Sequence, residues 1–172
     1  RADEELIGML RTALQMLPER DGALRVRVLA RLAVELYFRN DPAEPEALSR
    51  EAVEMAERLG ETRVMLVAKH SRRLAILGPD TAEDDLTAGE EIVELARVAD
   101  DGEMEFQGHH LKLNALIQLG DLGGVDRELR AGEKLARKLR QPRYEAQVTA
   151  FRSMRAQVRG DHPYLLDPAE AP

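Results

Sequence analysis

Two adjacent histidines, His109 and His110, are the side chains best suited to proton transfer or ligand binding, because imidazole titrates near neutral pH. Neighbours on a helix point about 100° apart, so this pair is poorly placed for one metal ion, which a helix holds at the i, i+4 spacing. The only other histidines are His70 and His162, and cysteine is absent. We therefore expect no metal site. We expect His109 and His110 to be partly buried and hydrogen-bonded at a helix interface, with a pH switch or a ligand contact as the alternative.

Pairs of adjacent carboxylates could serve in acid–base catalysis, and they occur at positions 84–85, 90–91 and 100–101. Such pairs at turns and helix starts usually cap the helix and interact favourably with its dipole. The sequence has neither the Gly-x-Ser-x-Gly motif of serine hydrolases nor the Gly-x-x-x-x-Gly-Lys-Ser/Thr motif that binds nucleotide phosphates. We therefore expect a protein that is not an enzyme and that uses no cofactor.

The composition favours packed helices. Of 172 residues, 44% are hydrophobic and only 3% are aromatic, which suits close helix packing better than a sheet. The lack of cysteine excludes disulfides and fits a reducing compartment, so we expect a cytoplasmic protein. No apolar run approaches the length of a membrane span, and we expect no membrane partner. The chain starts with Arg1 rather than Met, which favours a segment of a longer protein.

Charge is distributed unevenly along the chain, although the net charge is −7. Acidic residues dominate positions 80–105, and basic residues dominate positions 127–159. The simplest interpretation is solvated faces on successive helices; the alternative is head-to-tail docking of neighbouring domains or of a second copy in a homo-oligomer. The basic segment matches no nucleic-acid recognition motif. We therefore expect nucleic acid to be contacted only through other domains of a parent protein.

Three segments repeat at a constant offset of 40 residues, namely 51–59, 91–99 and 131–139. Within them Ala56, Ala96 and Ala136 occupy the same position. A fixed period of this size is typical of a helical solenoid, in which each helix pair buries its apolar face against its neighbours. The sequence therefore predicts an all-α fold, an α–α superhelix of about four helix pairs.

We expect one domain. An N-terminal capping helix in 1–22 precedes four repeats at 23–60, 61–102, 103–141 and 142–160, and residues 161–172 form a tail. Turn signals near Asn40, Gly78, Gly120 and Gly160 separate the two helices of each pair. Counted back from these turns, the first helices also align. On one apolar helical face, their first column is Val26, Val64, Phe106 and Ala146, and their second is Leu29, Val67, His109 and Thr149.

The stretch 116–122, Leu-Ile-Gln-Leu-Gly-Asp-Leu, resembles the turn between the helices of tetratricopeptide repeats in their longer form of about 40 residues. Residues 27–38 and 48–56 are in addition similar to the helical-repeat region of large LuxR-type, ATPase-containing actinobacterial transcriptional regulators, and this likeness covers about residues 20–160. The resemblance implies a non-catalytic arm that recognises a protein or an effector. A purely structural scaffold or oligomerisation module is the alternative.

In tetratricopeptide-like solenoids the first helices line a concave groove, and this resemblance implies a binding site on the equivalent face. The implied groove residues are Arg27, Val34, Phe38, Met65, Arg72, Ile76, Gln107, His110, Asn114, Gln118, Gln147 and Met154. Their mixture of apolar and amide side chains favours a protein domain, a peptide or a small effector as the partner.

Overall fold

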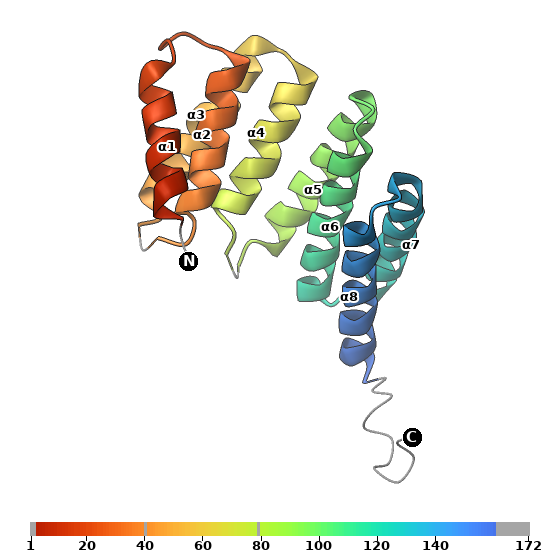
Figure 1. Ribbon diagram of the computed structural model, residues 1–172. Coiled ribbons are helices and arrows are strands. Elements are labelled where there is room, and N and C mark those ends of the chain that lie inside the picture. The colour runs from red at the N-terminus through yellow and green to blue at the C-terminus, as the bar shows by residue number, and fades with distance from the viewer. Residues whose placement is uncertain (1–2, 40, 79, 161–172) are drawn as a thin grey trace.

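The computed structural model describes residues 3–39, 41–78 and 80–160, and these residues form eight α-helices and no strand (Figure 1). The helices are α1 (Glu4–Met16), α2 (Ala23–Leu36), α3 (Ala43–Leu59), α4 (Thr62–Ala75), α5 (Ala82–Val98), α6 (Gly102–Leu119), α7 (Leu122–Leu139) and α8 (Pro142–Arg159). The all-α prediction is confirmed. None of these helices combines the length and the apolar character that a membrane crossing requires. The expected tail, 161–172, lies outside the described residues.

Local sequence signals set the ends of several helices. The side chain of Asp3 accepts a hydrogen bond from the backbone N–H of Leu6 at 3.1 Å and caps α1. Asp101 and Asp121 cap α6 and α7 in the same way. Gly60 ends α3 with a φ of 67°, a left-handed conformation that glycine adopts without a steric penalty.

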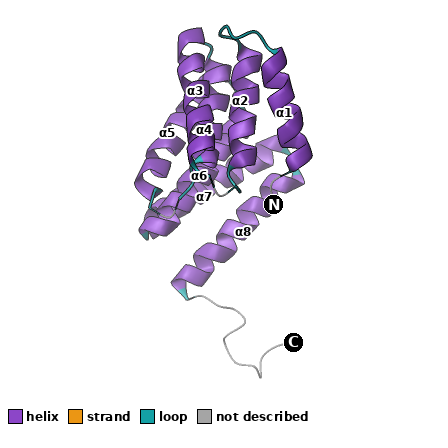
Figure 2. Cartoon of the chain, turned by 90° about the vertical axis from the view of Figure 1, so that its left-hand side faces the viewer, coloured by secondary structure: helices purple, strands orange, loops and turns teal. Residues whose placement is uncertain are grey.

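The helices follow one another in an open row, with α1 at one end and α8 at the other (Figure 1). Each helix packs on the next one along the chain, and α2 also packs on α4. The row turns along its length, so that α8 runs in a different direction from α1 to α4 (Figure 2).

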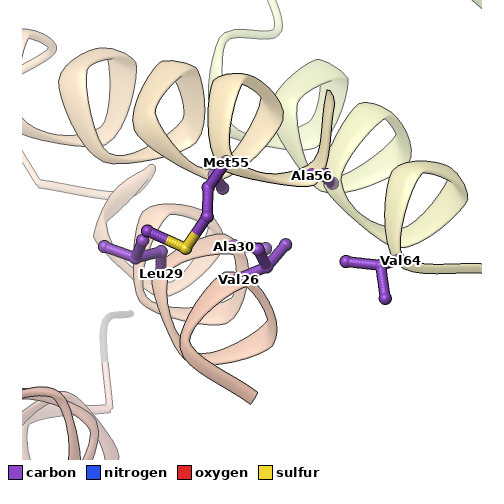
Figure 3. Close-up of a cluster of buried hydrophobic side chains, with 8 residues drawn as sticks. Val26, Leu29, Ala30, Met55, Ala56 and Val64 are labelled. Atoms are coloured by element: carbon purple, nitrogen blue, oxygen red, sulfur yellow. The ribbon is translucent and has the colours of Figure 1, made fainter. Parts of the chain in front are cut away.

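Three consecutive helices share each of the main hydrophobic clusters. The first cluster joins α2, α3 and α4, and Met55 reaches from α3 toward Leu29 of α2 (Figure 3). A second cluster joins α4, α5 and α6, and a third joins α6, α7 and α8. The repeated alanines Ala56, Ala96 and Ala136 each lie in one of these clusters at 2% exposure or less, because a small side chain lets neighbouring helices approach.

The buried face of α8 differs from the prediction. Ala146 and Thr149 were expected to be buried, but both are exposed. Tyr144, Val148 and Phe151 are buried instead. The ring of Tyr144 packs on Phe106 of α6, with 4.7 Å between the ring centroids. Burying a large aromatic side chain is more favourable than burying alanine or threonine, so α8 packs with its aromatic face inward.

Candidate functional site

A cavity of about 490 Å³ opens between α4 and α6. Its walls include His70 and Leu74 from α4 and His110 and Asn114 from α6. The volume falls within the range of small-molecule sites in proteins, roughly 300–1,000 Å³. Because apolar and polar side chains from separate helix pairs also meet in its wall, this cavity is the candidate binding site of the chain.

The close packing of α5 on α6 explains why this space exists. Gly89 of α5 and Gly108 of α6 face each other so closely that a Cβ atom on Gly108 would lie 2.7 Å from Cγ2 of Val93. This contact draws α6 onto α5. Leu66 of α4 and Leu111 of α6 belong to one buried cluster together with Ile92 and Ala96 of α5, and the cavity lies beside this cluster, between α4 and α6.

A buried ion pair forms part of the cavity wall. Arg73 of α4 donates hydrogen bonds from Nε and Nη2 to Oδ1 of Asp85 on α5, the first of them at 2.7 Å. The hydroxyl of Thr81 donates to Oδ2 of the same carboxylate at 2.8 Å. Arg73 is 9% exposed and Asp85 is 2% exposed. The carboxylate is thus fixed from both sides, and the charge of the guanidinium is balanced where it meets the cavity.

Asp85 belongs to a carboxylate pair that was expected to cap a helix, but its side chain is buried and accepts hydrogen bonds from Arg73 and Thr81 instead. The only local signal of its burial is its i, i+4 spacing from Thr81, which places both side chains on one helix face. Its charge partner, Arg73, lies across the connection between α4 and α5, and no sequence pattern indicated this pairing.

The two adjacent histidines have different surroundings. His109 is 5% exposed, and its Nδ1 lies 2.5 Å from Oε2 of Glu128 on α7, which confirms the expected burial and hydrogen bond at a helix interface. Lys112 Nζ lies 2.8 Å from the other oxygen of Glu128. Burial alone would raise the pKa of Glu128, but the hydrogen bonds from His109 and Lys112 outweigh it and the pKa is lowered.

Like His70 of α4, His110 lines the cavity. Its ring also packs edge-on against Phe151, with 4.9 Å between the centroids. Burial lowers the pKa of His110, and burial together with repulsion by His110 lowers the pKa of His70 to about 4. Both imidazoles are therefore uncharged at neutral pH and can donate and accept hydrogen bonds.

We expect His70 to make the fold sensitive to mild acid. Its pKa is about 4 in the folded chain and near 6.5 in the unfolded chain, so the unfolded state binds more protons between these values and stability falls as the pH falls. At pH 5 this difference corresponds to a loss of about 2 kcal/mol relative to neutral pH. Urea unfolding of the parent and His70→Gln at pH 7.5 and pH 5.0 measures it. The variant should lose less stability on acidification; an equal loss in both proteins would contradict the assignment.

Four of the twelve groove residues implied by the resemblance line the cavity, and all four lie on α6. They are Gln107, His110, Asn114 and Gln118. On α4 the cavity-facing residues are instead His70, Arg73 and Leu74, and Leu77 lines the cavity from the turn that follows α4. The sequence missed these four as well as Tyr37, Gly78, Asp85 and Leu111.

The other eight implied residues lie outside this cavity. Met65 packs against the first hydrophobic cluster, and Arg72 lies 3.4 Å from the hydroxyl of Ser49 on α3. The remaining positions lie on other parts of the surface or are half-buried there: Arg27, Val34, Phe38, Ile76, Gln147 and Met154. Thus only the α6 part of the groove implied by the resemblance lines the cavity.

No protein-family model, curated protein or solved structure matches this chain. Over residues 3–39, 41–78 and 80–160, no group of three or more His, Cys, Asp or Glu side chains is placed to hold a metal ion. The cavity and its wall are therefore the features of the chain that bear on its function.

Proposed function

We propose that this chain is a non-catalytic recognition module that binds a small effector in the cavity between α4 and α6. The observation that carries the proposal is the convergence of polar side chains from two separate helix pairs on one space of ligand size, namely His70 from α4 with Gln107, His110 and Asn114 from α6.

The chemistry of the wall supports binding over catalysis. A catalytic site needs a nucleophile or base that is free to reach a substrate. The carboxylate of Asp85 is already engaged by Arg73 and Thr81. The cavity-lining residues that the structure describes include no serine, threonine, cysteine or lysine. The bases that remain in the wall are the imidazoles of His70 and His110, and no serine, threonine, cysteine or lysine lies beside them in the described part of the wall for them to activate. Such a wall is suited to orienting a ligand through hydrogen bonds.

In the wider proposal, the eight helices form a tetratricopeptide-like superhelix that serves as the effector-recognition arm of a LuxR-type transcriptional regulator. The repeat at 40 residues and the shared clusters of three consecutive helices support it. A ligand between α4 and α6 would touch two neighbouring repeats at once. If α4 and α6 can adopt two spacings, the ligand would favour the spacing to which it binds more tightly. The free-energy difference between the two spacings would change by the difference between the ligand's binding free energies for them.

Filling the cavity tests this function. Gln107→Phe places a larger side chain in the wall, and Gln157→Phe makes the same change at an exposed position of α8 away from the cavity. A library of small fragments is screened by ligand-observed NMR against the parent and both variants. Fragments that bind the parent should also bind Gln157→Phe, and should bind Gln107→Phe at least about tenfold more weakly, a change of roughly 1.4 kcal/mol.

Circular dichroism establishes that both variants keep the helical fold. If the fragments bind all three proteins equally well, the cavity is not the recognition site. A structural scaffold or oligomerisation module would then be the better explanation of the chain.

A further inference from the structure

The wall of the α4–α6 cavity carries no net charge. Arg73 contributes one positive charge and Asp85 contributes one negative charge, and the two are joined by hydrogen bonds. The imidazoles of His70 and His110 are neutral at pH 7, since burial lowers the pKa of each. The other polar groups of the wall are amides and the phenol of Tyr37.

A charged ligand would find no free counter-ion in this wall. An anion that approached Arg73 would also approach Asp85, which is 2% exposed and held in place by Thr81. A cation that approached Asp85 would meet Arg73 in the same way. Removing a charge from water without a partner costs far more than removing a neutral polar group. The fixed ion pair therefore selects against ligands of either sign.

The polar groups of α6 form a stripe along one helix face. Gln107, His110, Asn114 and Gln118 follow one another at spacings of three and four residues, which align on a helix. Asn114 donates one hydrogen bond from Nδ2 to the backbone oxygen of His110 at 3.2 Å, and its amide oxygen can still accept one. The stripe thus offers both donors and acceptors to a ligand.

The α4 side of the cavity is more apolar. Leu74 and Leu77 line it from α4 and the turn that follows, and Leu111 extends the apolar surface from α6. A ligand that satisfies both sides needs an apolar body against the leucines and an edge that both donates and accepts hydrogen bonds. A planar ring with a primary amide has these properties.

We propose that the α4–α6 cavity is a binding site for an uncharged small molecule that has an apolar body and an amide-like edge, with the body on Leu74 and Leu77 and the edge on the polar stripe of α6. This inference rests on the proposed function and names the class of its effector.

Three probes of nearly equal shape separate charge from fit: benzamide is neutral, benzoate is an anion and benzamidinium is a cation. Each is titrated at pH 7.5 into the parent, Gln107→Phe and Gln157→Phe, and the dissociation constant is measured from chemical-shift changes in two-dimensional NMR. Benzamide should bind the parent and Gln157→Phe at millimolar concentration, at least about tenfold more tightly than either ion. Its binding should be lost in Gln107→Phe.

The outcomes separate this inference from the function on which it rests. If benzoate or benzamidinium binds as tightly as benzamide, and Gln107→Phe abolishes that binding, the ligand class is wrong and the recognition site stands. If benzamide fails to bind while library fragments still respond to Gln107→Phe, the ligand class is likewise wrong. If Gln107→Phe changes the binding of no probe and no fragment, both proposals fail.

Discussion

Replacing Asp85 by alanine should lower the free energy of unfolding by about 3–5 kcal/mol, because the variant leaves the guanidinium of Arg73 buried without its counter-ion. Arg73 is 9% exposed, so water in the cavity reaches only a small part of this side chain. Thr81 would lose a hydrogen-bond acceptor at the same time. Urea unfolding followed by circular dichroism at pH 7.5 measures the change.

Asp21→Ala provides the matched control. Asp21 also binds an arginine through two hydrogen bonds, at 2.6 and 2.9 Å from Arg58, but this pair lies at the surface. Surface ion pairs contribute little to stability, so the control should shift the unfolding midpoint far less. Replacing both buried partners, Arg73→Met with Asp85→Leu, should restore much of the stability lost in Asp85→Ala. Equal effects of Asp85→Ala and Asp21→Ala would show that the buried pair has no special role.

The second large effect is expected at the contact between α5 and α6. Gly108→Leu should destabilise the fold by about 3 kcal/mol or more, which is the upper part of the range for overpacked cores. A Cβ atom at position 108 would lie 3.0 Å from the backbone nitrogen of Val93 and 3.1 Å from the carbonyl oxygen of Gly89. Backbone atoms cannot rotate away, so α6 would have to move away from α5.

Gly8→Leu is the control for helix propensity, because no atom lies within 4 Å of a Cβ atom at that position of α1. Leucine is a better helix former than glycine, so this variant should gain about 0.5–1 kcal/mol. Urea unfolding of both variants gives the two free energies. If Gly108→Leu is as stable as the parent, α5 and α6 are not held together as tightly as the structure shows. The same variant should also weaken benzamide binding, since a displaced α6 changes the cavity.

The sequence predicted the helical elements well because local chemistry determines them. The constant offset of Ala56, Ala96 and Ala136 identified the second helix of each pair, and all three side chains are buried. Asp3 and Gly60 are of residue types that commonly begin and end helices, and they do so here. These features depend on spacing and on the residue type alone, which a single sequence contains.

The position of the cavity could not be predicted in the same way. Helical periodicity shows which face of a helix is apolar, but not how far apart two helices lie. That distance depends here on Gly89 and Gly108, which lie on different helices and whose contact no repeat revealed. The buried pair of Arg73 and Asp85 could not be predicted either, because burial is inferred from apolar residues and both of these residues are charged.

Within the site, the prediction was closer for α6 than for α4. Gln107, His110, Asn114 and Gln118 line the cavity because α6 remains helical through Leu119. By contrast, α4 ends at Ala75 and the backbone at Ile76 is no longer helical, with φ of −125° and ψ of 21°. Helical spacing therefore no longer predicts side-chain direction after Ala75, and Leu77 lines the cavity where Ile76 was expected.

The sharing of each main hydrophobic cluster among three consecutive helices has a consequence for how the chain acquires its structure. Contacts between residues close in sequence need only short loops to close, so little chain entropy is lost before the first favourable burial. Low contact order of this kind is associated with fast folding. During synthesis on the ribosome, α2, α3 and α4 could bury their shared side chains before the codons for α8 are translated.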